Sequence, residues 1–90
     1  MFRYKRSIHV DYEKQGYIYF VSRRYEILSQ RDKRRIESLC REEGGEYWKA
    51  LFEFVTTDTG AAEICRKHYI SASTLERAVR RYYVKFAELL

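Results

Sequence analysis

The 90-residue sequence contains no proline and only four glycines. Because proline interrupts helices and glycine weakens them, their scarcity favours long helices and disfavours a loop-rich all-β fold. No apolar run approaches the roughly 18 residues that a membrane-spanning helix needs. The basic start MFRYKR is followed by SIHVDYEKQ, which forms no apolar signal-peptide region. The sequence therefore predicts a cytoplasmic protein without a membrane segment.

Few side chains are suited to catalysis or metal binding. Cys40 and Cys65 lie inside helical patterns, which predicts reduced, buried and inert thiols. Cys65 and His68 are the only close Cys/His pair, and no second pair completes the three or four ligands of a zinc site. The pair Gly44-Gly45 lacks the spacing and the lysine of a phosphate-binding loop. We therefore expect no enzyme, no metal, no cofactor and no small-molecule substrate.

Hydrophobic residues make up 46% of the chain and aromatic residues 17%, including nine tyrosines. This composition supplies a core and excludes the disordered class. A chain of this length predicts one domain over residues 1–90.

The net charge of +5 is unevenly distributed. Residues 66–85 contain six basic side chains and one acidic side chain, and the first ten residues contain three basic side chains and no acid. Residues 11–59 are close to neutral. A neutral body with a cationic end is typical of a nucleic-acid-binding protein.

The pattern along the chain predicts about five helices. Residues 1–10 lack a periodicity and form either a mobile basic arm or a short extended segment. Asp11 is the expected N-cap of the first helix. Residues 17–22 also resemble a strand, but no partner strand appears elsewhere, so helix is favoured. The residues expected on one face of this helix are Tyr12, Tyr19, Phe20, Tyr25 and Ile27.

The next two helices have clearer end signals. Ser29 is the expected cap of a helix that Gly44-Gly45 terminates, with Ile36, Leu39 and Cys40 as its apolar stripe. The segment GEYWKALFEFVTT forms the third helix, with Tyr47, Trp48, Leu51, Phe52 and Val55 directed at the core. Thr57, Asp58 or Thr59 is expected to cap the fourth.

The last third of the chain predicts a helix-turn-helix over residues 61–89. A short helix, AAEICRKHY, points Ile64 and Cys65 inward, and a second helix starts near Ser73 and runs to about Glu88. Ile70 is expected to pack into the core at the corner, and Leu75 and Ala78 are expected on the inner face of the second helix. Ser71 or Ser73 caps that helix, with Glu76 at the capping-box distance from Ser73.

The residues Glu63-Ile64-Cys65 and ISASTLER, residues 70–77, resemble the helix-turn-helix DNA-binding superfamily in its homeodomain-like and sigma-factor-like forms. The resemblance covers about a quarter of the chain. It departs at Tyr69, where the family usually carries glycine, so the tightness of the corner stays open. The rest of the chain resembles small bacterial mobile-element proteins.

The resemblance implies that the last helix enters the major groove of double-stranded DNA. Arg77 would contact guanine, and the three hydroxyl residues would bond phosphates or bases. The implied DNA-binding residues are Arg66, Lys67, Ser71, Ser73, Thr74, Arg77, Arg80, Arg81 and Lys85. The simpler alternative is that the arginines of the last helix only solvate its exposed face. Similarly, Arg3, Lys5 and Arg6 form either a disordered tail or a minor-groove arm.

The expected function is therefore that of a small transcriptional regulator or a mobile-element accessory protein that binds DNA. The alternative is a protein–protein interaction module that uses the basic, tyrosine-rich last helix. Tyr82, Tyr83 and Phe86 are expected in the core, and Tyr82 and Tyr83 would form the contact in the alternative. Whether the chain forms a homodimer or binds another protein stays open. RNA binding ranks lower because the sequence contains no RNA-recognition motif.

Overall fold

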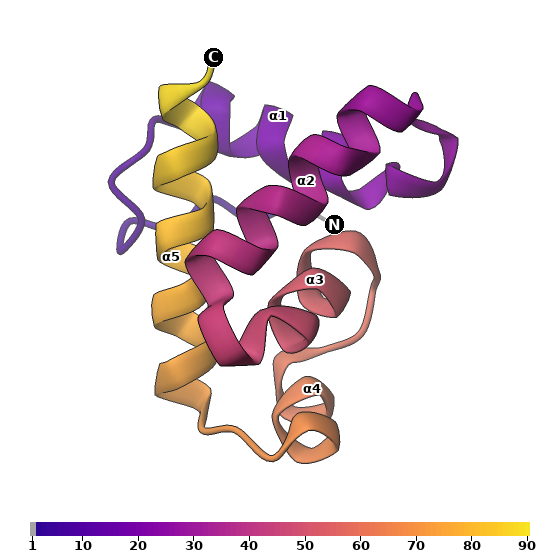
Figure 1. The fold of residues 1–90 in the computed structure, drawn as a ribbon. Coiled ribbons are helices and arrows are strands. Elements are labelled where there is room, and N and C mark those ends of the chain that lie inside the picture. The colour runs from indigo at the N-terminus through magenta and orange to yellow at the C-terminus, as the bar shows by residue number, and fades with distance from the viewer. Residues whose placement is uncertain (1) are drawn as a thin grey trace.

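Helices make up the regular structure of residues 2–90, the part of the chain that the computed structural model describes (Figure 1). This confirms the predicted all-α class. Two short 3₁₀ turns, Tyr25–Ile27 and Gly45–Tyr47, follow α1 and precede α3. The α-helices are α1 Tyr12–Arg23, α2 Gln30–Gly44, α3 Trp48–Thr56, α4 Ala61–His68 and α5 Ala72–Glu88.

Local signals determine most helix ends. The Asp11 carboxylate accepts a hydrogen bond from the Lys14 amide at 2.9 Å, and the Ser29 hydroxyl accepts one from the Asp32 amide at 3.2 Å. Both residues are the predicted N-caps. Gly45 has a φ of 57° directly after α2, where a side chain would be strained.

The predicted cap of the fourth helix is wrong. Gly60 is the N-cap of α4 and provides no side-chain hydrogen bond. The Thr57 hydroxyl instead donates to the Glu53 carbonyl at 2.7 Å and accepts from the Thr59 amide at 3.2 Å. Thr57 therefore belongs to the end of α3, where its hydroxyl satisfies one of the last carbonyls of that helix.

Residues 17–22 are helical, as favoured, but the residues expected on one helical face do not form the face that this helix buries. Tyr12 and Phe20 are exposed, and the side chains that α1 buries are Gln15, Ile18 and Ser22. The helix ends at Arg23, so its phase does not continue to Ile27, which is exposed. Two of the three inward residues are polar, and a hydrophobic pattern does not select them.

The core lies around α5, which contacts all four other α-helices. Tyr82, Tyr83 and Phe86 are buried there, as expected, and Cys40 is buried in α2. Cys65 is only partly buried, so the prediction of a buried thiol is wrong for this residue. The Cα radius of gyration is 12.1 Å, close to the value of about 12 Å expected for a compact chain of this length.

Residues 5–10 of the N-terminal segment pack against this core. Ile8 and Val10 are buried, and the side chain of Gln15 holds the segment by hydrogen bonds to its backbone. The Gln15 amide nitrogen donates to the carbonyls of Lys5, Ile8 and Val10 at 2.8–3.2 Å, and its oxygen accepts from the Lys5 amide at 3.0 Å. The segment is not uniformly extended, because residues 6 and 7 form a turn in which the Ile8 amide donates to the Lys5 carbonyl at 3.2 Å.

Candidate nucleic-acid interface

The corner between α4 and α5 consists of Tyr69, Ile70 and Ser71. Tyr69 has φ 55° and ψ 46°, the left-handed conformation that glycine adopts most easily. It is the one non-glycine residue with positive φ in the described chain, and its side chain is 93% exposed. The Ile70 amide donates to the Cys65 carbonyl at 3.1 Å, the closure typical of a left-handed helix end. Tyrosine therefore adopts the tight geometry that the sequence left open.

Glu53 of α3 fixes the end of α4. Its carboxylate lies 2.9 Å from His68 Nε2 and 3.1 Å from Lys67 Nζ. The hydrogen bond with His68 is the main cause that lowers the pKa of the Glu53 carboxyl, and Lys67 adds to it. These contacts hold the corner against the bundle and partly neutralise the charge of Lys67.

The first turn of α5 is capped by Ser71, one of the two predicted candidates. The Ser71 hydroxyl accepts from the Thr74 amide at 3.1 Å and donates to the Thr74 hydroxyl at 2.8 Å. Ser73 lies inside the helix with its side chain exposed, 3.3 Å from the Ser71 hydroxyl. Of the three hydroxyl residues implied in DNA binding, Ser71 and Thr74 thus mainly satisfy each other.

The start of α5 faces solvent on one side and the core on the other. Leu75 and Ala78 are buried, as expected for its inner face. Ser73, Glu76 and Arg77 are exposed. The preceding helices therefore leave the outer face of this turn uncovered.

The six implied basic residues have different surroundings. Arg66 and Arg77 are exposed and form no side-chain hydrogen bond or ion pair within residues 2–90. Lys67 pairs with Glu53, and Lys85 Nζ lies 3.7 Å from Glu88 Oε1. Arg80 is half-buried, and its Nε atom is buried without a partner among the described residues.

Arg81 has a structural contact that sequence reasoning missed. Its Nε and Nη2 atoms donate to the Glu43 carbonyl at 3.1 and 2.9 Å. This carbonyl lies at the end of α2, where backbone oxygens lack helical partners. Arg81 therefore joins α5 to α2. The two residues are 38 positions apart, so no local pattern indicates the contact.

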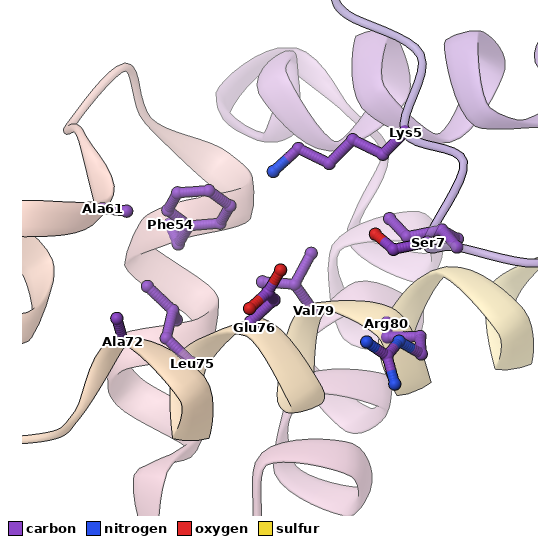
Figure 2. Close-up of a pocket in the computed structure, with 10 residues that line it drawn as sticks. Lys5, Ser7, Phe54, Ala61, Ala72, Leu75, Glu76, Val79 and Arg80 are labelled. Atoms are coloured by element: carbon purple, nitrogen blue, oxygen red, sulfur yellow. The ribbon is translucent and has the colours of Figure 1, made fainter.

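A cavity of about 220 Å³ lies beside the first half of α5 (Figure 2). Phe54, Leu75 and Val79 give it an apolar lining. Lys5 from the N-terminal segment and Glu76 from α5 extend toward it from opposite sides (Figure 2). Lys5 of the N-terminal segment therefore lies beside the first half of α5.

Other kinds of site find no support in residues 2–90. No cluster of three or more His, Cys, Asp or Glu side chains is placed to hold a metal ion. None of the described helices is both long and apolar enough to cross a membrane. No protein-family model, curated protein or solved structure matches the chain.

Proposed function

We propose that this chain binds double-stranded DNA as a small transcriptional regulator or mobile-element accessory protein, with the first half of α5 in the major groove. The observation that carries the proposal is the exposed opening turn of α5. In the next turn Arg77 is exposed and has no side-chain hydrogen bond or ion pair with residues 2–90, while Leu75 and Ala78 hold the inner face of the helix in the core. A helix can enter the groove only when its leading side chains are accessible in this way.

The surroundings of each residue define its proposed role. Arg77 reads a guanine edge, and Ser73 with the free backbone amides of the first turn contacts phosphate or a neighbouring base. Arg66 on α4 contacts the DNA backbone, and Lys67 contributes less because Glu53 already pairs with it. Arg81 is not part of the proposed interface because its guanidinium is bound to the end of α2.

The corner supports the same arrangement. The left-handed conformation of Tyr69 performs the role that glycine has in the resembled motif, so α4 and α5 approach each other within three connecting residues. The exposed Tyr69 ring lies at this corner, next to the opening turn of α5, and its hydroxyl is available to a phosphate group.

Fluorescence anisotropy with labelled random-sequence duplex DNA tests the proposal. We expect micromolar dissociation constants at low salt, because backbone contacts dominate non-specific binding. The logarithm of the binding constant should fall with the logarithm of salt concentration, with a slope of about −0.9 for each phosphate contacted. Absence of binding at low salt would refute the proposal.

Three matched variants separate the roles. Arg66→Ala should weaken binding to all duplexes alike, whereas Arg77→Ala should also relax the preference among sequences selected from a random pool. Arg34→Ala removes an exposed arginine from α2 and should change neither property. The start of α2 and the start of α5 lie at opposite ends of the fold, which makes this a suitable control (Figure 1). Equal effects of all three variants would contradict the assigned interface.

A further inference from the structure

Five aromatic rings from the N-terminal segment and α1 form a connected surface, here called the aromatic surface: Phe2, Tyr4, Tyr12, Tyr19 and Phe20. The Phe2 ring lies 5.6 Å from the rings of Tyr12 and Tyr19 and 6.2 Å from that of Phe20, between centroids. Tyr4 extends the surface, with its centroid 6.0 Å from that of Tyr12. None of the five rings belongs to α4 or α5.

The outer rings of this surface are open to solvent. Tyr4, Tyr12 and Phe20 are 48%, 58% and 51% exposed. Phe2 lies beneath them, 3.4 Å from the position that a Cβ atom on Gly16 would occupy, so α1 supports the group from below. Soluble proteins rarely leave connected apolar groups exposed unless the surface binds a partner.

The charges around the aromatic surface indicate an anionic partner. Arg3, Lys5 and Arg6 are exposed on the same segment as Phe2 and Tyr4, and the first ten residues contain no acid. The Arg23 guanidinium lies 5.1 Å from the centre of the Tyr19 ring. Acids are also present: Asp58 pairs with Arg23, Glu76 lines the same cavity as Lys5, and Asp11 and Glu13 lie at the start of α1. Arg3 and Arg6 form no ion pair within residues 2–90. A symmetric contact with a second copy would place the three cations opposite each other, which opposes self-association.

We propose that the aromatic surface binds single-stranded nucleic acid. Unpaired bases stack on Tyr4, Tyr12 and Phe20, and the phosphates between them meet Arg3, Lys5 and Arg6. Exposed aromatic faces beside a row of cations are the combination that holds unpaired strands, since every base has a flat face and every nucleotide a negative charge. This inference does not depend on the proposed duplex binding, because none of its contact residues belongs to α4 or α5, although Lys5 lines the cavity beside α5.

Anisotropy titrations with fluorescein-labelled oligo(dT) test the inference. Tyr12→Ala and Phe20→Ala should each weaken binding at least about fivefold, the lower end expected for loss of one base stack. Tyr12→Phe keeps the ring and should bind within about twofold of the parent. Tyr17→Ala is the matched control, since Tyr17 is 53% exposed on the same helix and is not part of the aromatic surface. It should leave binding unchanged.

The outcomes are distinguishable from those of the duplex experiment. Arg77→Ala should impair binding to duplex DNA and leave oligo(dT) binding intact, while Tyr12→Ala should do the reverse. No oligo(dT) binding at low salt would overturn the inference and leave the aromatic surface to a protein partner. Binding that Tyr12→Ala and Phe20→Ala leave unchanged would also overturn it, because charge alone would then explain the affinity. Thermal unfolding of each variant verifies that these exposed substitutions preserve the fold.

Discussion

The hydroxyl of Ser22 lies 2.7 Å from the hydroxyl of Tyr82, and both side chains are buried. This hydrogen bond joins α1 to α5 across 60 positions of sequence. It gives the buried phenol of Tyr82 a partner in a region that water does not reach, and it therefore fixes how these two helices face each other.

Removal of the Ser22 hydroxyl should be costly. Ser22→Ala leaves the Tyr82 hydroxyl buried without a partner, so we expect the free energy of unfolding to fall by about 1–3 kcal/mol. The combined variant Ser22→Ala/Tyr82→Phe removes both polar groups and should lose less than the sum of the two single changes. Urea unfolding of the four proteins measures this coupling. Strictly additive losses would contradict it.

Gln15 should contribute strongly to the stability of the fold, although it is a polar residue. Gln15→Met keeps the approximate length of the side chain but removes its four hydrogen bonds to the N-terminal segment. We expect the free energy of unfolding to fall by at least about 2 kcal/mol because several backbone groups lose their partners. Lys14→Met, at the exposed neighbouring position, is the control and should have little effect. Urea unfolding measures both changes, and hydrogen exchange at the Ile8 and Val10 amides should accelerate in Gln15→Met alone.

Tyr69 adopts its left-handed conformation at an energetic cost. For a residue with a side chain this conformation costs about 1–2 kcal/mol. Glycine avoids that cost, but its greater freedom in the unfolded chain offsets part of the gain in stability. Tyr69→Gly should therefore raise the free energy of unfolding by up to about 1 kcal/mol. Tyr17→Gly, within α1, should lower it by about 1 kcal/mol. Thermal unfolding compares the two variants, and destabilisation by Tyr69→Gly would show that the ring makes a compensating contact.

Alkaline pH should unfold the protein through its buried acids. Burial raises the pKa of the Cys40 thiol from 9.0 to about 12 and that of the Tyr83 phenol from 10.0 to about 12, and burial also raises the pKa of Tyr82. The folded state therefore keeps protons that the unfolded state releases. The stability from this source is fully present below about pH 9 and falls as pH rises toward 12.

The loss should approach about 1.4 kcal/mol per pH unit for each such group. Urea unfolding from neutral pH to about pH 11 measures the slope. Tyr83→Phe should make this slope shallower, because phenylalanine has no proton to release. Tyr17→Phe, at an exposed position, should leave it unchanged. If neither substitution alters the slope, groups other than Tyr83 cause the pH dependence, and the assignment to Tyr83 is wrong.

Features determined by neighbouring residues were predictable. The absence of proline and the spacing of apolar residues predict the all-α class, and short-range hydrogen bonds place Asp11 and Ser29 as caps. The same holds for α5, whose inner residues Leu75 and Ala78 follow the helical period. These signals need only a few adjacent positions, so a single sequence contains them.

Features that depend on distant residues were not predictable. Gln15 and Ser22 face the core because partners elsewhere in the chain satisfy their polar atoms, and hydrophobicity alone assigns such residues to the surface. The contact of Arg81 with the Glu43 carbonyl has the same origin, and it removes one arginine from the implied DNA-binding set. The opening turn of α5 is exposed, as the prediction required, and the roles of its residues and of the other cations in DNA binding stay predictions.

The order of residues 5–10 also affects how shortened forms of this protein would behave. Ile8 and Val79 of α5 line the same cavity, and Gln15 binds the backbone on both sides of Ile8. Proteolysis after Val10 would uncover apolar side chains beneath α5 and leave a polar amide unsatisfied. Such trimming would loosen the very helix proposed to touch DNA, although the cleaved bonds lie at the other end of the sequence.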